Sequence, residues 1–197
     1  MEVGAGVGAH ALTLAASVGA EGHLFLYESR RVVQRVLWQN LAANRVTNAT
    51  VMRRALSRGR EAEAIAPGSA ALASRSNPAI PVANEILDEL QLERLDWLKI
   101  NAGVSALEIL KGAAETLWRL RPLLFSAVPD ELALTEFASR VTVFSYRCWR
   151  METPLFNPEN FNHRKENIFS ARTALALLAI PEEIEVDILL EGCEEIP

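Results

Sequence analysis

Short apolar runs alternate along the chain with longer segments whose apolar residues recur at helical spacing. The run at 23–28 predicts a strand that ends at Glu28. A helix is predicted from Arg31 onward by apolar residues spaced at i, i+3, i+4 and i+8, namely Val33, Val36, Leu37 and Leu41. Strands that alternate with helices are typical of an α/β fold with a parallel sheet.

The same pattern continues through the rest of the chain. Further strands are predicted over 49–57, 95–100, 121–128, 141–149 and 186–192. Helices are predicted over 9–18 and 86–92, and over a segment with the apolar stripe Leu107, Leu110, Ala114 and Leu117. Two segments rich in loop-forming residues predict a long surface excursion over 58–84 and a Pro/Asn-rich loop over 153–169. We find no internal repeat, and we expect a single domain over 1–197.

Composition narrows the class of protein. Half of the 197 residues are hydrophobic, 23% are charged, and the net charge of −5 argues against a nucleic-acid partner. The two cysteines, Cys148 and Cys193, have no metal-binding or disulfide-framework spacing, so no metal site is expected. No apolar run approaches the roughly 18 residues that span a bilayer. We therefore expect a soluble, cytoplasmic protein without a membrane partner; its oligomeric state is not indicated.

Three glycines form the most informative motif. Gly4, Gly6 and Gly8 stand in "EVGAGVGAH", between a predicted strand end and a predicted helix. Glycine lets the backbone turn sharply and approach a ligand closely. The helix that follows offers unpaired N–H groups and a positive dipole end, which suit a nucleotide or the carboxylate of an amino-acid-like cofactor. The pattern also fits the dinucleotide fingerprint, with Ala9 in its last place.

Glu28 strengthens the case for a nucleoside site. It ends the second predicted strand, about 20 residues beyond the loop, where an acid can accept hydrogen bonds from ribose hydroxyls. NAD and S-adenosylmethionine (SAM) use the same device, so the loop and Glu28 leave both cofactors open.

The second half of the chain favours SAM over NAD through its resemblance to a known protein family. The stretch "LDWLKINAGVSALEILKGAAETLWRLRPLL" resembles the "DLLKIDVEGAELEVLKGA…RP" typical of FkbM-family methyltransferases. "EVGAGVGAHALTLA" is similar to that family's "DVGANIGAHTL", "YES" stands where the family has "FEP", and "RRALS" where it has "NAALS". The likeness runs from residue 2 to about residue 128.

The resemblance implies a class I, Rossmann-like methyltransferase fold with a mostly parallel sheet of six or seven strands and helices on both faces. Family members use SAM, and several O-methylate hydroxyls of sugars or polyketides. The residues implied for the SAM loop are Glu2, Gly4, Ala5, Gly6 and Gly8. By the same resemblance Glu28 would bind ribose, and Ala55 and Leu56 would lie near the adenine.

The chain departs from the family where "KIDVEGAE" would stand. Asn101 replaces the Asp, Gly103 and Ala106 replace the two Glu residues, and Val104 replaces the Gly. Methyl transfer from a sulfonium depends chiefly on positioning and in-line geometry, so losing these acids weakens the enzymatic interpretation without cancelling it. Asn101 can hydrogen-bond the cofactor or an acceptor hydroxyl, although it cannot take a proton, and it is our first candidate catalytic and cofactor residue.

Two histidines and the amino terminus complete the expectations. His163 lies in the 153–169 loop, which would suit a lid over the acceptor site, and it is the second candidate catalytic residue. An exposed loop histidine is the plainer interpretation of His163, and a polar helix-end residue is the plainer one of His10. Since Met1 directly precedes the motif, we expect a truncated first strand, with neighbouring backbone groups short of partners.

The sequence thus predicts SAM-dependent O-methyl transfer to a small molecule or a saccharide. An alternative is a catalytically impaired domain that binds SAM or a nucleoside without turning it over, as the altered "INAGVSA" segment suggests. An NAD(P) oxidoreductase would need a substrate domain with a proton donor, and no such region follows.

Overall fold

The computed structural model describes residues 1–59, 84–101, 104–160, 162–170, 172–186 and 192–197. It forms two compact units, Met1–Arg121 and Pro122–Pro197. The excursion predicted over 58–84 lies outside the described residues except at its two ends. No helix in the described part of the chain is both long and apolar enough to cross a membrane.

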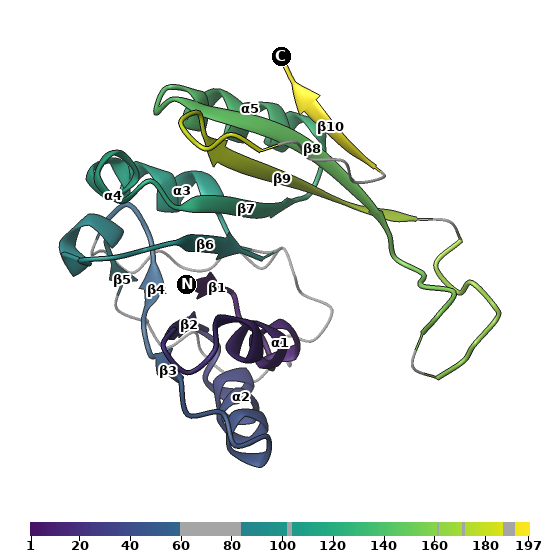
Figure 1. Cartoon of the computed structure of the whole chain (residues 1–197). Coiled ribbons are helices and arrows are strands. Elements are labelled where there is room, and N and C mark those ends of the chain that lie inside the picture. The colour runs from purple at the N-terminus through teal and green to yellow at the C-terminus, as the bar shows by residue number, and fades with distance from the viewer. Residues whose placement is uncertain (60–83, 102–103, 161, 171, 187–191) are drawn as a thin grey trace. The chain divides into compact units, whose positions relative to one another are not determined.

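The first unit is a parallel α/β arrangement (Figure 1). Its elements are β1 (Glu2–Val3), α1 (Ala9–Val18), β2 (Leu24–Tyr27), α2 (Arg31–Ala43), β3 (Ala49–Met52), β4 (Ala55–Leu56), β5 (Asn84–Glu85), a 3₁₀ helix (Leu87–Leu90), β6 (Trp97–Ile100), α3 (Ala106–Lys111) and α4 (Ala114–Leu120). Four strands pair in parallel in the order β6-β1-β2-β3, and β4 and β5 form a separate parallel pair. The predicted α/β fold with parallel strands is confirmed.

The two-residue strand β1 is hydrogen-bonded on both sides. Glu2 is in register with Leu26 of β2 and with Lys99 of β6. The Met1 amino group donates to the Trp97 carbonyl at 2.7 Å, which continues the pairing with β6 to the first residue. The first strand is as short as expected, yet it pairs with a longer strand on each side.

The core of this unit explains the positions of the first two helices. Both helices contribute to one apolar cluster with β2 and β3. Its buried members are Ala5, Ala11, Ala15, Leu24, Leu26, Leu37, Leu41 and Val51. The helical spacing read from the sequence therefore marks the faces that pack, and α1 has the predicted bounds.

The helix predicted around Leu107–Leu117 is wrong as one continuous element, because it is two helices separated at Gly112. A Cβ on Gly112 would come within 2.8 Å of the Ser57 carbonyl oxygen, so the backbone passes closely there. The Asp88 carboxylate accepts hydrogen bonds from the Glu115 and Thr116 N–H groups at 3.1 and 2.8 Å. These bonds satisfy donors in the first turn of α4 and support a new helix start.

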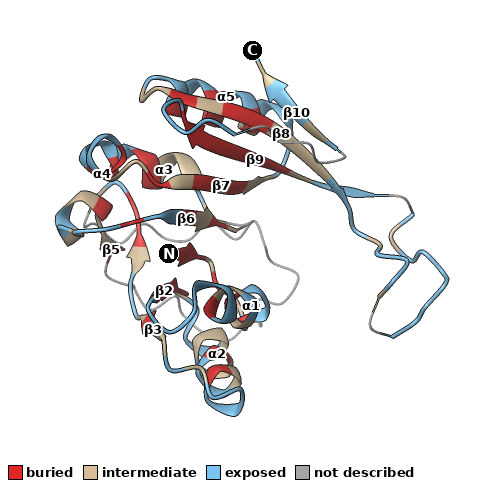
Figure 2. Ribbon diagram, viewed as in Figure 1, coloured by how far each residue is buried: buried red, intermediate tan, exposed pale blue. Residues whose placement is uncertain are grey.

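The second unit is an antiparallel sheet with one long helix. Its elements are β7 (Leu123–Val128), α5 (Glu131–Thr142), β8 (Tyr146–Pro154), β9 (Thr173–Pro181) and β10 (Cys193–Ile196), with strand order β7-β9-β8-β10. Figure 2 shows that burial is concentrated at the start of β8 and in the second part of β9, whereas the described residues of the segment joining these strands are mostly exposed. The segment predicted as a loop over 153–169 makes up most of this connection, although Thr153 and Pro154 still belong to β8.

Three features of this unit differ from the sequence predictions. Helix α5 and strand β9 were not predicted, and the strand predicted over 141–149 begins later because residues 141 and 142 end α5. Helix α5 has an amino-terminal cap, since Asp130 accepts a hydrogen bond from the Ala133 N–H at 2.9 Å. The strand predicted over 186–192 falls mostly outside the described residues, and the last described strand is β10.

Candidate functional site

The glycine loop joins the carboxyl end of β1 to α1. Gly4, Gly6 and Gly8 all have positive φ, at 76°, 59° and 91°. A Cβ on Gly4 or Gly8 would come within 2.7 Å of a neighbouring side chain, whereas a Cβ on Gly6 would meet no atom of the described residues within 4 Å. Packing therefore restricts two of the glycines, and the space beside Gly6 is open to a ligand.

Helix α1 directs its positive end to the same edge of the sheet. The Leu12 N–H makes the first intrahelical bond, to the Gly8 carbonyl at 3.1 Å. The three preceding N–H groups, of Ala9, His10 and Ala11, therefore have no acceptor within the helix. No acidic residue lies in the first turn, so the dipole is not neutralised there. Such an edge favours an anionic group.

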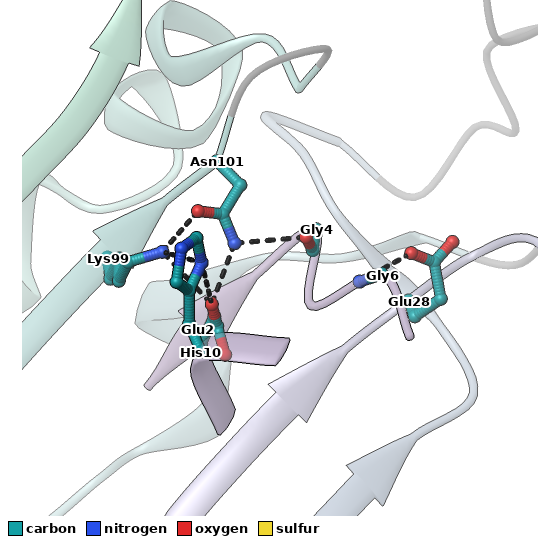
Figure 3. A network of polar contacts seen from close by, with 7 residues as sticks. All are labelled: Glu2, Gly4, Gly6, His10, Glu28, Lys99 and Asn101. Carbon is teal, nitrogen blue, oxygen red and sulfur yellow. Dashed lines mark hydrogen bonds and ion pairs between the residues drawn. The ribbon is translucent and has the colours of Figure 1, made fainter. Parts of the chain in front are cut away.

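Glu28 directly follows β2, at the strand end where the sequence predicts it, and its side chain lies against the glycine loop. Its side chain is almost fully buried. Its Oε2 accepts the Gly6 N–H at 3.0 Å (Figure 3). The carboxylate also pairs with Arg30, whose Nε and Nη2 donate to Oε1 and Oε2 at 2.9 and 3.0 Å. The hydrogen bonds with Glu28 raise the pKa of Arg30.

Glu2, Lys99 and Asn101 form a second polar cluster beside the loop (Figure 3). The fully buried Glu2 accepts hydrogen bonds at Oε1 from Lys99 Nζ at 3.0 Å and Asn101 Nδ2 at 2.8 Å. Asn101 Nδ2 also donates to the Gly4 carbonyl at 3.0 Å, and Asn101 Oδ1 accepts from Lys99 Nζ. Asn101 therefore ties β6 to the loop, and most of its hydrogen-bonding capacity is used within the protein.

One oxygen of the buried Glu2 has no donor in the part of the chain that the structure describes. Among the described residues, no group donates a hydrogen bond to Glu2 Oε2. An unsatisfied buried acceptor costs about 1–3 kcal/mol, which a ligand donor or a water molecule at this position would recover. His10 lies on the open side of the cluster, 68% exposed, with Nδ1 3.2 Å from Lys99 Nζ and 3.7 Å from Glu2 Oε1.

Ala55 and Leu56 form β4, beyond the carboxyl end of β3. A polar link connects their neighbour β5 with the end of β2, because Tyr27 Oη donates to Glu85 at 3.0 Å. Burial, followed by this hydrogen bond, raises the pKa of Tyr27. The two residues predicted to lie near adenine are thus in a strand pair tied to the same edge as Glu28.

His163 is on an exposed turn of the second unit. It has a φ of 52°, and its N–H donates to the Asn160 carbonyl at 2.9 Å. The residues of the glycine loop and Asn101, in contrast, belong to the first unit. The role predicted for His163 stays a prediction.

Arg30 and Lys99 are not among the residues predicted from the sequence, although both hold site carboxylates. Both positions are notable in the sequence. Lys99 is the lone cation within the apolar run "WLKI", and Arg30 lies two residues after Glu28. A cation within a buried strand is costly unless it is paired, which is the signal that could have singled out Lys99.

A shallow cavity of about 750 Å³ lies away from this cluster. It is lined by the end of α1, the turn before β2 and the segment 44–48 before β3. These segments lie at the amino ends of the parallel strands, whereas the loop follows the carboxyl end of β1. Parallel α/β sheets bind ligands beyond the carboxyl ends of their strands, so the loop and Glu28 form the better candidate site. The described residues hold no cluster of three or more His, Cys, Asp or Glu that could bind a metal.

Comparisons with known proteins reveal similarity in structure. No protein-family model matches the chain, and no curated protein matches it. The methyltransferase FkbM of Methylobacillus flagellatus KT superposes with a TM-score of 0.58 at 15% identity, over 90% of this chain and 42% of that one. A SAM-dependent O-methyltransferase of Thermotoga maritima gives 0.57 at 16% identity, over 94% and 60% of the respective chains. An rRNA methylase of Streptococcus thermophilus gives 0.52 at 12% identity, over 91% and 84%.

These likenesses show the fold. The chain covers less than two thirds of the FkbM and Thermotoga proteins, and nearly the full length of the rRNA methylase. Each of the three proteins is named for methyl transfer, although they are named for different acceptors or for none. The chain therefore has the Rossmann-like α/β fold of class I methyltransferases, as the sequence predicted.

Proposed function

We propose that the chain is a SAM-dependent methyltransferase domain that binds its cofactor between the glycine loop and Glu28. The observation that carries the proposal is the open space beside Gly6, bounded by the start of α1 and by a buried carboxylate at the end of β2. A fold of the class I methyltransferase type places these groups at one edge of a parallel sheet. The combination suits an amino-acid-like nucleoside better than either feature alone.

The residues present fit the groups that SAM carries. The first turn of α1 offers N–H donors for the carboxylate of its methionine part. Glu28 would take the ribose hydroxyls, and Ala55 and Leu56 would lie near adenine. Glu2 Oε2, which receives no hydrogen bond from the described residues, adds an acceptor beside the loop that is complementary to an ammonium group or to a bound water molecule. Glu2, Gly4, Ala5, Gly6 and Gly8 would form the wall of the site, and Asn101 would hold that wall in place.

When bound, SAM supplies a methyl group on a sulfonium, which an acceptor oxygen attacks in line. The protein's part is then to position the two reactants and to exclude water. Asn101 keeps the loop attached to β6 and takes no proton. We propose a hydroxyl acceptor on a small molecule or saccharide, supported by the resemblance to FkbM-type sequences, the likeness to an O-methyltransferase and the net charge of −5. His163 remains a candidate for a lid position.

A second candidate function is a domain that binds SAM without turning it over. Its support is specific: Asn101 stands in place of an acid, and the side chain is engaged with Glu2, Gly4 and Lys99. Position 101 therefore offers no carboxylate to a methyl acceptor. The two candidates share the cofactor site and differ in catalysis.

The test of the cofactor site is calorimetric titration with S-adenosylhomocysteine. We expect micromolar binding by the wild-type chain and loss of binding in Gly6→Arg, because the new side chain would enter the open space. Gly19→Arg is the matched control, since Gly19 also has a positive φ, of 69°, with no atom within 4 Å of its Cβ position, and lies at the far end of α1. Absence of binding by a folded wild-type chain would contradict the proposal.

Turnover separates the two candidates. Release of S-adenosylhomocysteine from SAM in the presence of a panel of hydroxylated small molecules and saccharides supports the enzyme. Binding without release across that panel supports the second candidate. Gly19→Arg should behave as the wild type in both assays.

A further inference from the structure

The Glu28 carboxylate has all of its acceptor positions in use. Oε1 accepts the Arg30 N–H at 2.8 Å and Arg30 Nε at 2.9 Å. Oε2 accepts the Gly6 N–H at 3.0 Å and Arg30 Nη2 at 3.0 Å. An ionised carboxylate offers about four lone-pair sites. No site is left for a ribose hydroxyl while these four bonds are present.

Two of the four donors belong to a side chain that can leave. The Gly6 and Arg30 N–H groups are backbone donors fixed by the loop and by the start of α2. The Arg30 guanidinium is on a long side chain that is 57% exposed, whereas the Glu28 side chain is 2% exposed. The guanidinium can move into water, and Glu28 would still keep two backbone hydrogen bonds.

The local helix gives no other reason for a cation at this position. Arg30 is the N-cap of α2, its side chain makes no capping hydrogen bond, and no acid lies in the first turn. A positive charge at a helix amino end opposes the helix dipole. The contacts that the structure gives the Arg30 side chain are with Glu28, the carboxylate predicted to bind ribose.

We propose that Arg30 competes with the cofactor's ribose for Glu28 and so sets the affinity of the site. This inference rests on the proposed function. In the absence of cofactor the guanidinium occupies the carboxylate in a bidentate pair. Binding of the nucleoside exchanges those two hydrogen bonds for bonds from the ribose hydroxyls. Arg30 thus lowers the affinity of the site for ligands whose ribose hydroxyls must displace it, and leaves ligands without those hydroxyls unaffected.

The first experiment compares Arg30→Ala with Arg31→Ala by titration with S-adenosylhomocysteine. Arg31 is the adjacent exposed arginine at the start of the same helix, so both variants remove the same charge from nearly the same place. We expect Arg30→Ala to tighten binding by about 5- to 20-fold, as for the loss of a competing charged hydrogen-bonded pair that is partly exposed. Arg31→Ala should stay within about twofold of the wild type.

Two further arms locate the gain at the ribose. With the 2′,3′-dideoxyribose analogue of S-adenosylhomocysteine, Arg30→Ala should give no gain in affinity, because the analogue has no ribose hydroxyls to donate to Glu28. In a Glu28→Gln background, Arg30→Ala should likewise give no gain, because the bidentate pair is already lost. A gain in either arm would show that Arg30 acts elsewhere and would overturn the inference.

The outcomes separate this inference from the proposed function. Wild-type binding with no gain, or with weaker binding, in Arg30→Ala overturns the competition and leaves the cofactor site standing. Wild-type binding that tightens in Arg30→Ala, with no gain in the two further arms, supports both. Failure of every folded variant to bind S-adenosylhomocysteine overturns the proposed function, and the inference with it.

Discussion

Asn101 Nδ2 donates a hydrogen bond of 2.8 Å to Oε1 of the buried Glu2, and so joins the end of β6 to the start of the glycine loop. The same nitrogen donates to the Gly4 carbonyl at 3.0 Å. An amide can bridge two acceptors in this way, whereas a carboxylate cannot donate at all. The Asn that departs from the FkbM pattern is therefore matched to the buried acid beside it.

Exchange of the amide and the acid tests this match. Asn101→Asp should destabilise the fold by about 1–3 kcal/mol, because two donors are lost and a like charge faces Glu2. In Glu2→Gln/Asn101→Asp, the new amide at position 2 can donate to the new carboxylate. Urea unfolding should show the double variant more stable than the sum of the single effects. Strict additivity of the two changes would contradict the pairing.

Lys99 carries the charge that balances Glu2. Lys99→Met should cost about 3–5 kcal/mol, because it leaves a buried carboxylate without its cation. Lys111→Met is the matched control, since Lys111 pairs with Glu108 on the helix surface at 2.6 Å and should contribute less than about 1 kcal/mol. Thermal unfolding of the two variants measures the difference. Equal losses would show that Glu2 does not depend on Lys99.

In a chain that begins at Met1, the free amino group gives the folded state a dependence on pH. Burial lowers the pKa of this amine from 8.0 to about 6, against smaller opposing effects from Glu2 and Asp96. The unfolded state therefore binds more protons between about pH 6 and 8, and the free energy of unfolding rises with pH across that window. The full effect of a two-unit shift is about 2–3 kcal/mol. Urea unfolding at pH 6, 7 and 8 checks it, and amino-terminal acetylation should flatten the series.

Gly4 and Val104 form a tight contact beside the loop. A Cβ on Gly4 would lie 2.7 Å from Val104 Cγ2, at a φ of 76°. Gly4→Ala should therefore lower stability by about 1–3 kcal/mol through overpacking and backbone strain. Val104→Ala should relieve part of that loss when the two are combined. If the combination is no better than the sum, strain alone accounts for the effect.

The sequence predicted those parts of the fold that depend on local pattern. Helix α1 has its predicted bounds because a glycine loop precedes it and apolar spacing marks its buried face. Glu28 directly follows β2 as predicted, because the apolar run that precedes it in the sequence forms that strand. Helix α5, which was not predicted, also has a local signal in Asp130 followed by apolar residues at helical spacing.

Other features depend on partners that the local pattern does not contain. The break between α3 and α4 arises where Ser57 and Asp88 approach from distant parts of the chain. The engagement of Asn101 with Glu2 is likewise set by the register of β1 against β6. Arg30 is close to Glu28 in sequence, but its effect depends on the direction in which a flexible side chain turns. Such features follow from tertiary structure.

The two-residue strand β1 makes the candidate site a late product of folding. Its partners, β2 and β6, lie about 24 and 97 residues further along the chain, and both must be present before β1 is held on its two sides. Closing the chain between β1 and β6 costs entropy before those few hydrogen bonds can form. Contacts between residues so far apart in sequence slow folding. A nascent chain would therefore acquire its glycine loop in working geometry only after β6 has left the ribosome and docked.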